Sequence, residues 1–208
     1  NVTVPNALAS IQFHTMRVGG ALTYAGDFGI DTVVFNGTAT QRVPSNVAYN
    51  FVRVSGNDVR MSTEDGSFNI AGWLEVSGGL LRVGEADSLT TVFVGGDFRT
   101  VAGGRLQMND VDNNLQIAGN ALFAGGSTSG LLTDGTIEVN GNFTQNTNPL
   151  AFVATLSQRT IFTGSGAATM QFANAGAAQS RFADVVFARS AGQTLTLLTA
   201  ARAENAEL

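Results

Sequence analysis

A turn glycine returns along this chain at an almost constant interval. Successive members of the series stand 24, 23, 22 and 23 residues apart, at Gly72, Gly96, Gly119, Gly141 and Gly164. A fixed period of this length is typical of a solenoid, because one such repeat cannot bury its own apolar face and must stack on its neighbours. Few other folds contain a constant repeat of 22–24 residues, so this period is the strongest indication of the architecture in the sequence.

Each repeat carries the same short pattern of apolar, any, apolar, small, Gly or Asn, polar, then Phe or Leu. Examples are Leu22–Phe28, Phe93–Phe98, Ile117–Leu122 and Ile137–Phe143. Alternation of apolar and polar residues indicates half-buried strands, and the Gly, Asn and Asp breaks indicate turns. The chain has 25 Gly in 208 residues and only 13% charged residues, which suits a turn-rich all-β protein. We therefore predict one parallel β-helix (β-solenoid) array over residues 1–208, with about nine coils of 22–24 residues; the alternative is an array of antiparallel β-sandwiches.

Two finer expectations follow from the repeat. Residues at similar offsets after the turn glycine should stack into an internal apolar ladder, and these are Leu74, Phe98, Leu122 and Phe143. The tail Leu198–Leu208 is compatible with a helix by propensity, but its part Ala201–Leu208 also fits the strand pattern in degenerate form. The pattern favours a strand there.

Three phrases resemble a known class of repeat protein: Gly-Asn-Phe-Thr-Gln at Gly141–Gln145, Val-Phe-Asn-Gly at Val34–Gly37, and Phe-Ala-Arg-Ser-Ala-Gly at Phe187–Gly192. They are similar to the repeats of secreted bacterial β-helix proteins, which are large surface and adhesin-like proteins. The resemblance implies a right-handed coil, export to the bacterial cell surface or beyond, and a long multi-repeat polypeptide. It implies no particular activity, because function depends on sites and not on the fold.

The composition of the chain excludes several classes of binding partner. With 16 Asp and Glu against 11 Arg and no Lys, the net charge is -5, which argues against nucleic acid because that partner requires a basic surface. No run of 18 apolar residues indicates a membrane span, and the absence of Cys excludes disulfides and thiolate metal sites. The chain begins at Asn1 and fits the repeat from its first residues. We therefore expect a segment of a longer chain or a filament subunit, with adjacent repeats or copies of itself as end-to-end partners and surface glycans as a further partner.

Four acidic residues form the most suggestive candidate site. Asp65, Asp87, Asp112 and Asp134 stand 22, 25 and 22 residues apart, and stacked carboxylates would suit Ca²⁺, a hard cation that prefers oxygen ligands. Asp is also a common turn former, and this preference by itself accounts for one Asp in each turn. The sequence leaves the calcium column as a hypothesis beside the stronger turn interpretation, and it indicates no other cofactor.

The same carboxylates would suit a carbohydrate-active enzyme or a polysaccharide-binding module if a groove accompanied them. Arginines at Arg60, Arg82 and Arg105 recur with the coil period, and residues 145–159 form the best candidate for a groove wall. The single Trp73 would stack on sugars if exposed, although aromatic residues in a solenoid belong more often to the core. His14 is the only histidine and has no evident catalytic partner in the sequence. We therefore predict a non-enzymatic structural protein, such as a surface stalk, an adhesin segment or a fibre.

Overall fold

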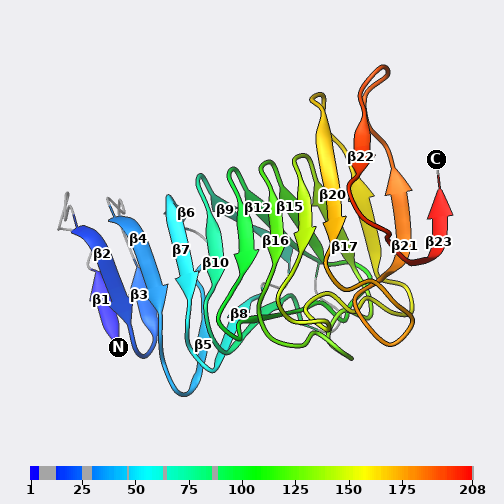
Figure 1. Cartoon of the computed structure of the whole chain (residues 1–208). Coiled ribbons are helices and arrows are strands. Elements are labelled where there is room, and N and C mark those ends of the chain that lie inside the picture. The colour runs from blue at the N-terminus through cyan, green and yellow to red at the C-terminus, as the bar shows by residue number, and fades with distance from the viewer. Residues whose placement is uncertain (5–12, 25–29, 46, 63–64, 86–88, 208) are drawn as a thin grey trace.

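The computed structural model describes the chain except for residues 5–12, 25–29, 46, 63–64, 86–88 and 208. In the described part, all regular structure consists of strands, and successive coils stack from the N-terminal end to the C-terminal end (Figure 1). Every strand pairing is parallel. The predicted all-β solenoid is therefore confirmed, and the sandwich alternative is wrong because its hairpins would pair antiparallel. The structure shows about seven turns; the count of nine and the right hand remain predictions.

In the part of the chain that the structure describes, the strands form sheets of nine, eight, four and two strands. The nine-stranded sheet contains β2 (Phe13–Val18), β4 (Ile30–Phe35), β7 (Phe51–Val54), β10 (Leu74–Val76), β13 (Phe98–Thr100), β16 (Ala121–Phe123), β18 (Phe143–Gln145), β20 (Ala168–Phe172) and β22 (Leu195–Leu197). The eight-stranded sheet contains β6 (Ala48–Tyr49), β9 (Asp65–Ile70), β12 (Leu89–Val94), β15 (Asn114–Ile117), β17 (Thr136–Val139), β19 (Arg159–Phe162), β21 (Phe182–Phe187) and β23 (Ala203–Glu207). The four-stranded sheet contains β5 (Thr40–Arg42), β8 (Asp58–Met61), β11 (Leu80–Val83) and β14 (Arg105–Gln107), and β1 (Val2–Val4) pairs with β3 (Leu22–Tyr24).

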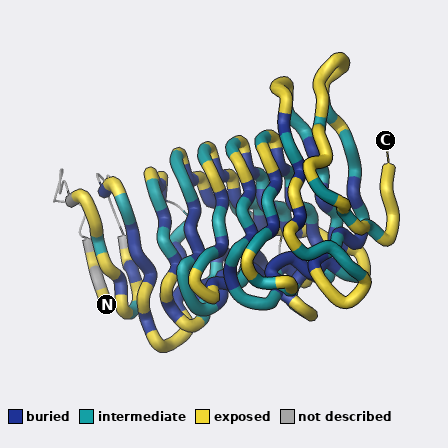
Figure 2. Tube along the Cα trace, viewed as in Figure 1, coloured by how far each residue is buried: buried dark blue, intermediate teal, exposed yellow. Residues whose placement is uncertain are grey.

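The core is a continuous apolar column between these sheets (Figure 2). Burial alternates residue by residue along β7, β8, β15, β17 and β19, as the period-two sequence pattern requires. Inward side chains also stack from coil to coil, since the strands pair in register. The expected strand at the tail is confirmed, because β23 pairs with β21 at the edge of the eight-stranded sheet.

The internal apolar ladder is confirmed with one correction. Leu74, Phe98, Ala121, Phe143 and Met170 pair in register along the nine-stranded sheet, and each is buried. The expected member Leu122 is wrong: it pairs with Arg99 and is only partly buried. The inward position lies two residues after the turn glycine, and a step of one residue turns a strand side chain to the opposite face.

The turn glycines also stack as the sequence predicts. The amide of Gly96 donates to the carbonyl of Gly72 at 2.8 Å, and the amide of Gly119 donates to Gly96 at 3.0 Å. A Cβ on Gly119 would lie 2.6 Å from the backbone of Gly96. Only glycine allows the coils to approach this closely at that corner.

Residues 145–159 do not form a groove wall. Ala151, Phe152, Val153 and Ala154 are buried, and Phe152 packs among rings of the core. The four-stranded sheet ends at β14, and only isolated bridges through Leu132 and Ala154 continue its line. The segment turns inward because the core beyond β14 needs apolar side chains that a regular third sheet no longer supplies.

Candidate functional site

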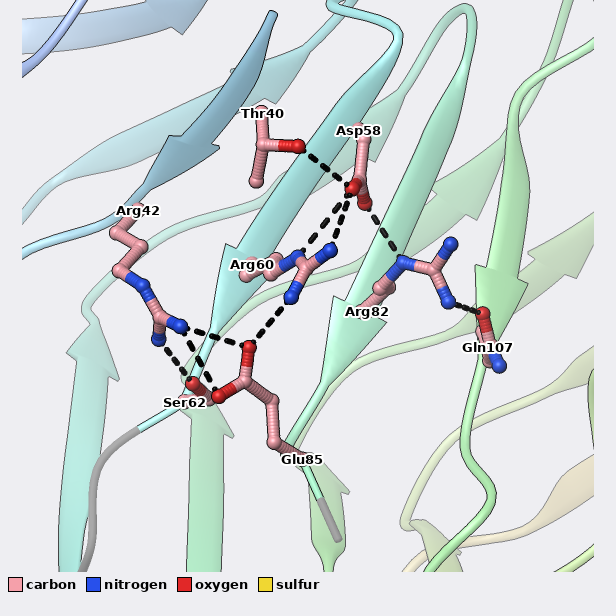
Figure 3. A network of polar contacts seen from close by, with 8 residues as sticks. All are labelled: Thr40, Arg42, Asp58, Arg60, Ser62, Arg82, Glu85 and Gln107. Atoms are coloured by element: carbon pink, nitrogen blue, oxygen red, sulfur yellow. Dashed lines mark hydrogen bonds and ion pairs between the residues drawn. The ribbon is translucent and has the colours of Figure 1, made fainter.

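The outer face of the four-stranded sheet carries a ladder of arginines. Arg42, Arg60 and Arg82 pair in register on β5, β8 and β11, and Gln107 on β14 continues the row (Figure 3). The predicted row of Arg60 and Arg82 is thus confirmed. Arg105 is not its next member, because it pairs with Leu80. Three like charges at strand spacing repel one another, so this ladder requires counter-charges.

Asp58 supplies the first counter-charge. Its Oδ2 accepts hydrogen bonds from Arg60 Nη2 at 3.0 Å and from Thr40 Oγ1 at 3.0 Å, and its Oδ1 accepts from Arg82 Nε at 2.7 Å. The donors come from three neighbouring strands. One carboxylate therefore ties β5, β8 and β11 together along the solenoid axis.

Glu85, just after β11, supplies the second counter-charge. Its Oε1 accepts from Arg60 Nη1 at 2.7 Å and from Arg42 Nη2 at 2.9 Å. Arg42 Nη1 also donates to Ser62 Oγ at 2.9 Å, and Arg82 Nη1 donates to Gln107 Oε1. We call the eight side chains of Figure 3 the polar ladder: Thr40, Arg42, Asp58, Arg60, Ser62, Arg82, Glu85 and Gln107.

The pKa values follow from these contacts. Burial opposes ionisation of Asp58, but hydrogen bonds from Arg60, Arg82 and Thr40 outweigh it and hold its pKa below the ordinary value. The hydrogen bond from Arg60, with a smaller one from Arg42, likewise lowers the pKa of Glu85 against the effect of burial. Both carboxylates are ionised near neutral pH and engaged by guanidinium groups. Such carboxylates are poor general acids or bases, since that role favours a pKa near the working pH.

A second charged cluster lies on the nine-stranded sheet. Glu75 is only 8% exposed, and its two carboxylate oxygens lie 2.6 Å from Arg53 Nε and 2.6 Å from Arg99 Nε. Both guanidinium groups lie over the ring of Trp73, at 5.6 and 5.5 Å from its centroid. Trp73 also stacks on Phe51 with centroids 5.2 Å apart. Trp73 is half-buried, and its ring already contacts Phe51 and two guanidinium groups, with which a sugar would have to compete.

The acidic column is interrupted in the described register. Asp65 begins β9 and pairs with Leu89, whereas Asp87 lies outside the described residues. Asp112 and Asp134 stand two residues before Asn114 and Thr136, which pair with each other. Asp112 lies in a turn, and its amide donates to Asp110 Oδ1 at 3.0 Å. The ladder position next to Asp65 thus belongs to a leucine.

Within the described residues, no group of three or more His, Asp or Glu side chains is arranged to hold a metal ion. The turn contact of Asp112 favours the turn interpretation of these acidic residues. Calcium binding stays a prediction.

Sequence reasoning missed one exposed pair. His14 Nδ1 lies 3.0 Å from Asp31 Oδ2, and both side chains are exposed. The signal for this pair is the strand register: β2 and β4 pair with an offset of 17 residues, which is the separation between His14 and Asp31.

In the described part of the chain, no helix is long and apolar enough to cross a membrane. The sequence and fold match no protein-family model, no curated protein and no solved structure.

Proposed function

We propose that this chain is a non-enzymatic structural element, namely a rigid rod in a surface stalk, an adhesin segment or a fibre. The observation that carries this proposal is that charged and polar side chains on the outer face contact one another from coil to coil along the solenoid axis. In the polar ladder, Asp58 and Glu85 join three successive coils. Side chains used in this way stiffen a rod, and the carboxylates of Asp58 and Glu85 are engaged by arginines rather than by a substrate.

A ladder at the turns supports the same function. Asp97 Oδ1 accepts from the amide of Asn120 at 2.7 Å, and Asn120 Oδ1 accepts from the amide of Asn142 at 2.9 Å. Asn142 Oδ1 then accepts from the amide of Thr169 at 2.8 Å. Four coils are thus linked at one corner by hydrogen bonds that run along the rod.

The proposed partners are coils of the same kind, from adjacent repeats or from a second copy. The outermost strands β22 and β23 each pair with only one neighbour in the described structure. Leu197 on β22 is 52% exposed, and the adjacent Leu198 is 55% exposed. An open strand edge with apolar side chains is a template for further strand pairing. A bacterial extracellular location is part of the proposal and rests on the sequence resemblance.

A carbohydrate-active enzyme is the less favoured alternative. The segment that would have walled a groove is packed into the core through Phe152, and the carboxylates of the polar ladder, Asp58 and Glu85, are bound by arginines. For these reasons we propose no catalytic residues.

The experiment is a turnover screen of the purified chain against neutral and acidic polysaccharides, combined with sedimentation velocity over a range of concentrations. We expect no turnover, and we expect end-to-end association that Leu197→Asp abolishes. The matched control is Leu156→Asp, since Leu156 is 73% exposed but lies in a turn between β18 and β19. Turnover that is lost in Asp58→Asn or Asp87→Asn would overturn the structural assignment.

A further inference from the structure

The outer face of the eight-stranded sheet contains a shallow hollow across three consecutive strands. It has a volume of about 180 Å³, and its lining includes Phe93, Gly95, Gln116, Ala118, Glu138 and Asn140. Phe93 on β12, Gln116 on β15 and Glu138 on β17 pair in register, so they form one row along the solenoid axis. The strands of the polar ladder belong to another sheet, of which β5 and β8 are labelled in Figure 1.

The row faces outward because its chain neighbours face inward. Val92 and Val94 on either side of Phe93 are buried, as are Leu115 and Ile117 on either side of Gln116. Gly95 and Ala118 follow the strands with little or no side chain, which leaves the depression beside the ring. Phe93 is 40% exposed and is the one aromatic residue among the exposed large apolar side chains of the described chain.

The hollow carries three polar side chains, Gln116, Glu138 and Asn140, which differ in how far they are engaged by the protein itself. Gln116 is half-buried, and within the described structure its side-chain amide makes no hydrogen bond. Glu138 uses Oε1 to accept from Asn114 Nδ2 at 3.3 Å, an interaction at the long limit for a hydrogen bond. Asn140 Oδ1 accepts from Thr163 Oγ1. The hollow therefore offers one apolar ring face beside amide and carboxylate groups.

We propose that this row binds a segment of a neutral linear glycan, laid across the strands and along the rod. An exposed aromatic ring provides an apolar surface on which the CH face of a sugar ring stacks, while amides and carboxylates bind its hydroxyl groups. The lining contains one carboxylate and no cation. The guanidinium of Arg189, which contacts Asn140, donates to the backbone carbonyls of Asn140, Thr163 and Gly166, so the charge of the lining itself disfavours an acidic glycan. This binding site goes beyond the structural function proposed above and requires no turnover.

The shape also favours a polymer segment over a compact ligand. Adjacent strands are about 4.8 Å apart, so the row from Phe93 to Glu138 spans roughly 10 Å. The volume is smaller than that of pockets which enclose small molecules, about 300–1,000 Å³. A protein partner fits less well, because the neighbouring outward row is polar, with Thr91, Asn114 and Thr136 in register.

The test is affinity electrophoresis of the intact chain in gels that contain a neutral β-glucan, a neutral xylan, a mannan, or polygalacturonate. We expect retardation by at least one neutral polysaccharide and none by polygalacturonate. Phe93→Ala should weaken binding about tenfold or more, and Phe93→Trp should retain it. Gln116→Ala should weaken binding by a smaller factor.

Two controls make the result decisive. Leu156→Ala removes another exposed apolar side chain outside the hollow and should bind like the wild type. Circular dichroism should show that Phe93→Ala keeps the fold, as expected for a partly exposed residue. The proposal is overturned if no neutral polysaccharide retards the chain, if Phe93→Ala binds as well as the wild type, or if polygalacturonate binds more tightly. Absence of binding leaves the structural function intact, so the two failures are distinguishable.

Discussion

The ring of Phe152 lies 5.0 Å from the ring of Phe143 and stands nearly perpendicular to it, at an interplanar angle of 79°. Phe143 belongs to the regular ladder of the nine-stranded sheet, whereas Phe152 comes from the long connection between β18 and β19. Edge-to-face packing of this kind is a favoured geometry for aromatic pairs. The contact attaches the longest irregular segment of this region to the repeat core.

Phe152→Ala should therefore be strongly destabilising. Phe152 is fully buried and also contacts the rings of Phe123, Phe172 and Phe182. Truncating a buried Phe typically costs about 3–5 kcal/mol, because transfer and cavity contributions add. Urea denaturation followed by circular dichroism measures the change. Leu156→Ala, a few residues away on the surface, should stay within about 0.5 kcal/mol of the wild type; equal effects of both variants would contradict the inward packing of the segment.

Gly104→Ala tests the closeness of the coils at a second corner. A Cβ on Gly104 would lie 2.0 Å from the carbonyl oxygen of Val76, whereas a Cβ on Gly166 would meet nothing within 4 Å. Forcing an extra atom into a packed site costs about 1–3 kcal/mol, so Gly104→Ala should lower the free energy of unfolding by that amount. Gly166→Ala is the matched control and should be neutral or slightly stabilising. Thermal denaturation of the two variants side by side gives the comparison.

The polar ladder should make stability depend on acid pH. The folded pKa values of Asp58 and Glu85 lie below their ordinary values, which are near 4 in unfolded chains. Their contribution is therefore complete above that range and is lost as pH falls through the folded pKa values. Wild-type stability, measured by urea denaturation between about pH 7 and pH 2, should fall as pH decreases.

The double variant Asp58→Asn/Glu85→Gln isolates this effect. It should be less stable than the wild type at neutral pH, and the difference should shrink as the pH is lowered. A difference that stays constant over the whole pH range would show that the two carboxylates do not carry the dependence. Added salt should reduce the difference only in part, since both side chains are partly shielded from solvent.

Glu75→Gln should leave two arginines without their shared counter-charge. Arg53 and Arg99 approach Glu75 from the coils on either side, so neutralising it brings two cations together over Trp73. We expect a loss of about 1–3 kcal/mol, less than for a fully buried pair because the arginines are 38% and 42% exposed. The matched control is Glu204→Gln, since Glu204 is 48% exposed beside Arg181 and should cost under about 0.5 kcal/mol. Fluorescence of the single Trp73 during denaturation reports directly on the cluster.

Much of the fold was predictable from local patterns. The glycine period and the strand alternation required stacked coils, and they placed Leu74, Phe98 and Phe143 correctly in the core. Leu122 was assigned to the wrong face by one residue, because period-two patterns are sensitive to a single step. The burial of Phe152 was not predictable from the repeat, because Phe152 lies outside the repeat pattern. Its position depends on the space in the core where the four-stranded sheet ends.

The candidate sites, too, were predictable from the sequence only in part. By itself, the sequence determined the coil period, the parallel strands and the recurrence of Arg60 and Arg82, because these follow from spacing along one chain. Only the tertiary structure decided the exact register, which placed Leu89 beside Asp65, brought Glu85 to Arg42 across 43 residues and exposed Phe93 above a hollow. The physical reason is that spacing fixes which coils are neighbours, whereas side-chain contacts depend on register and on where each long side chain finds a partner.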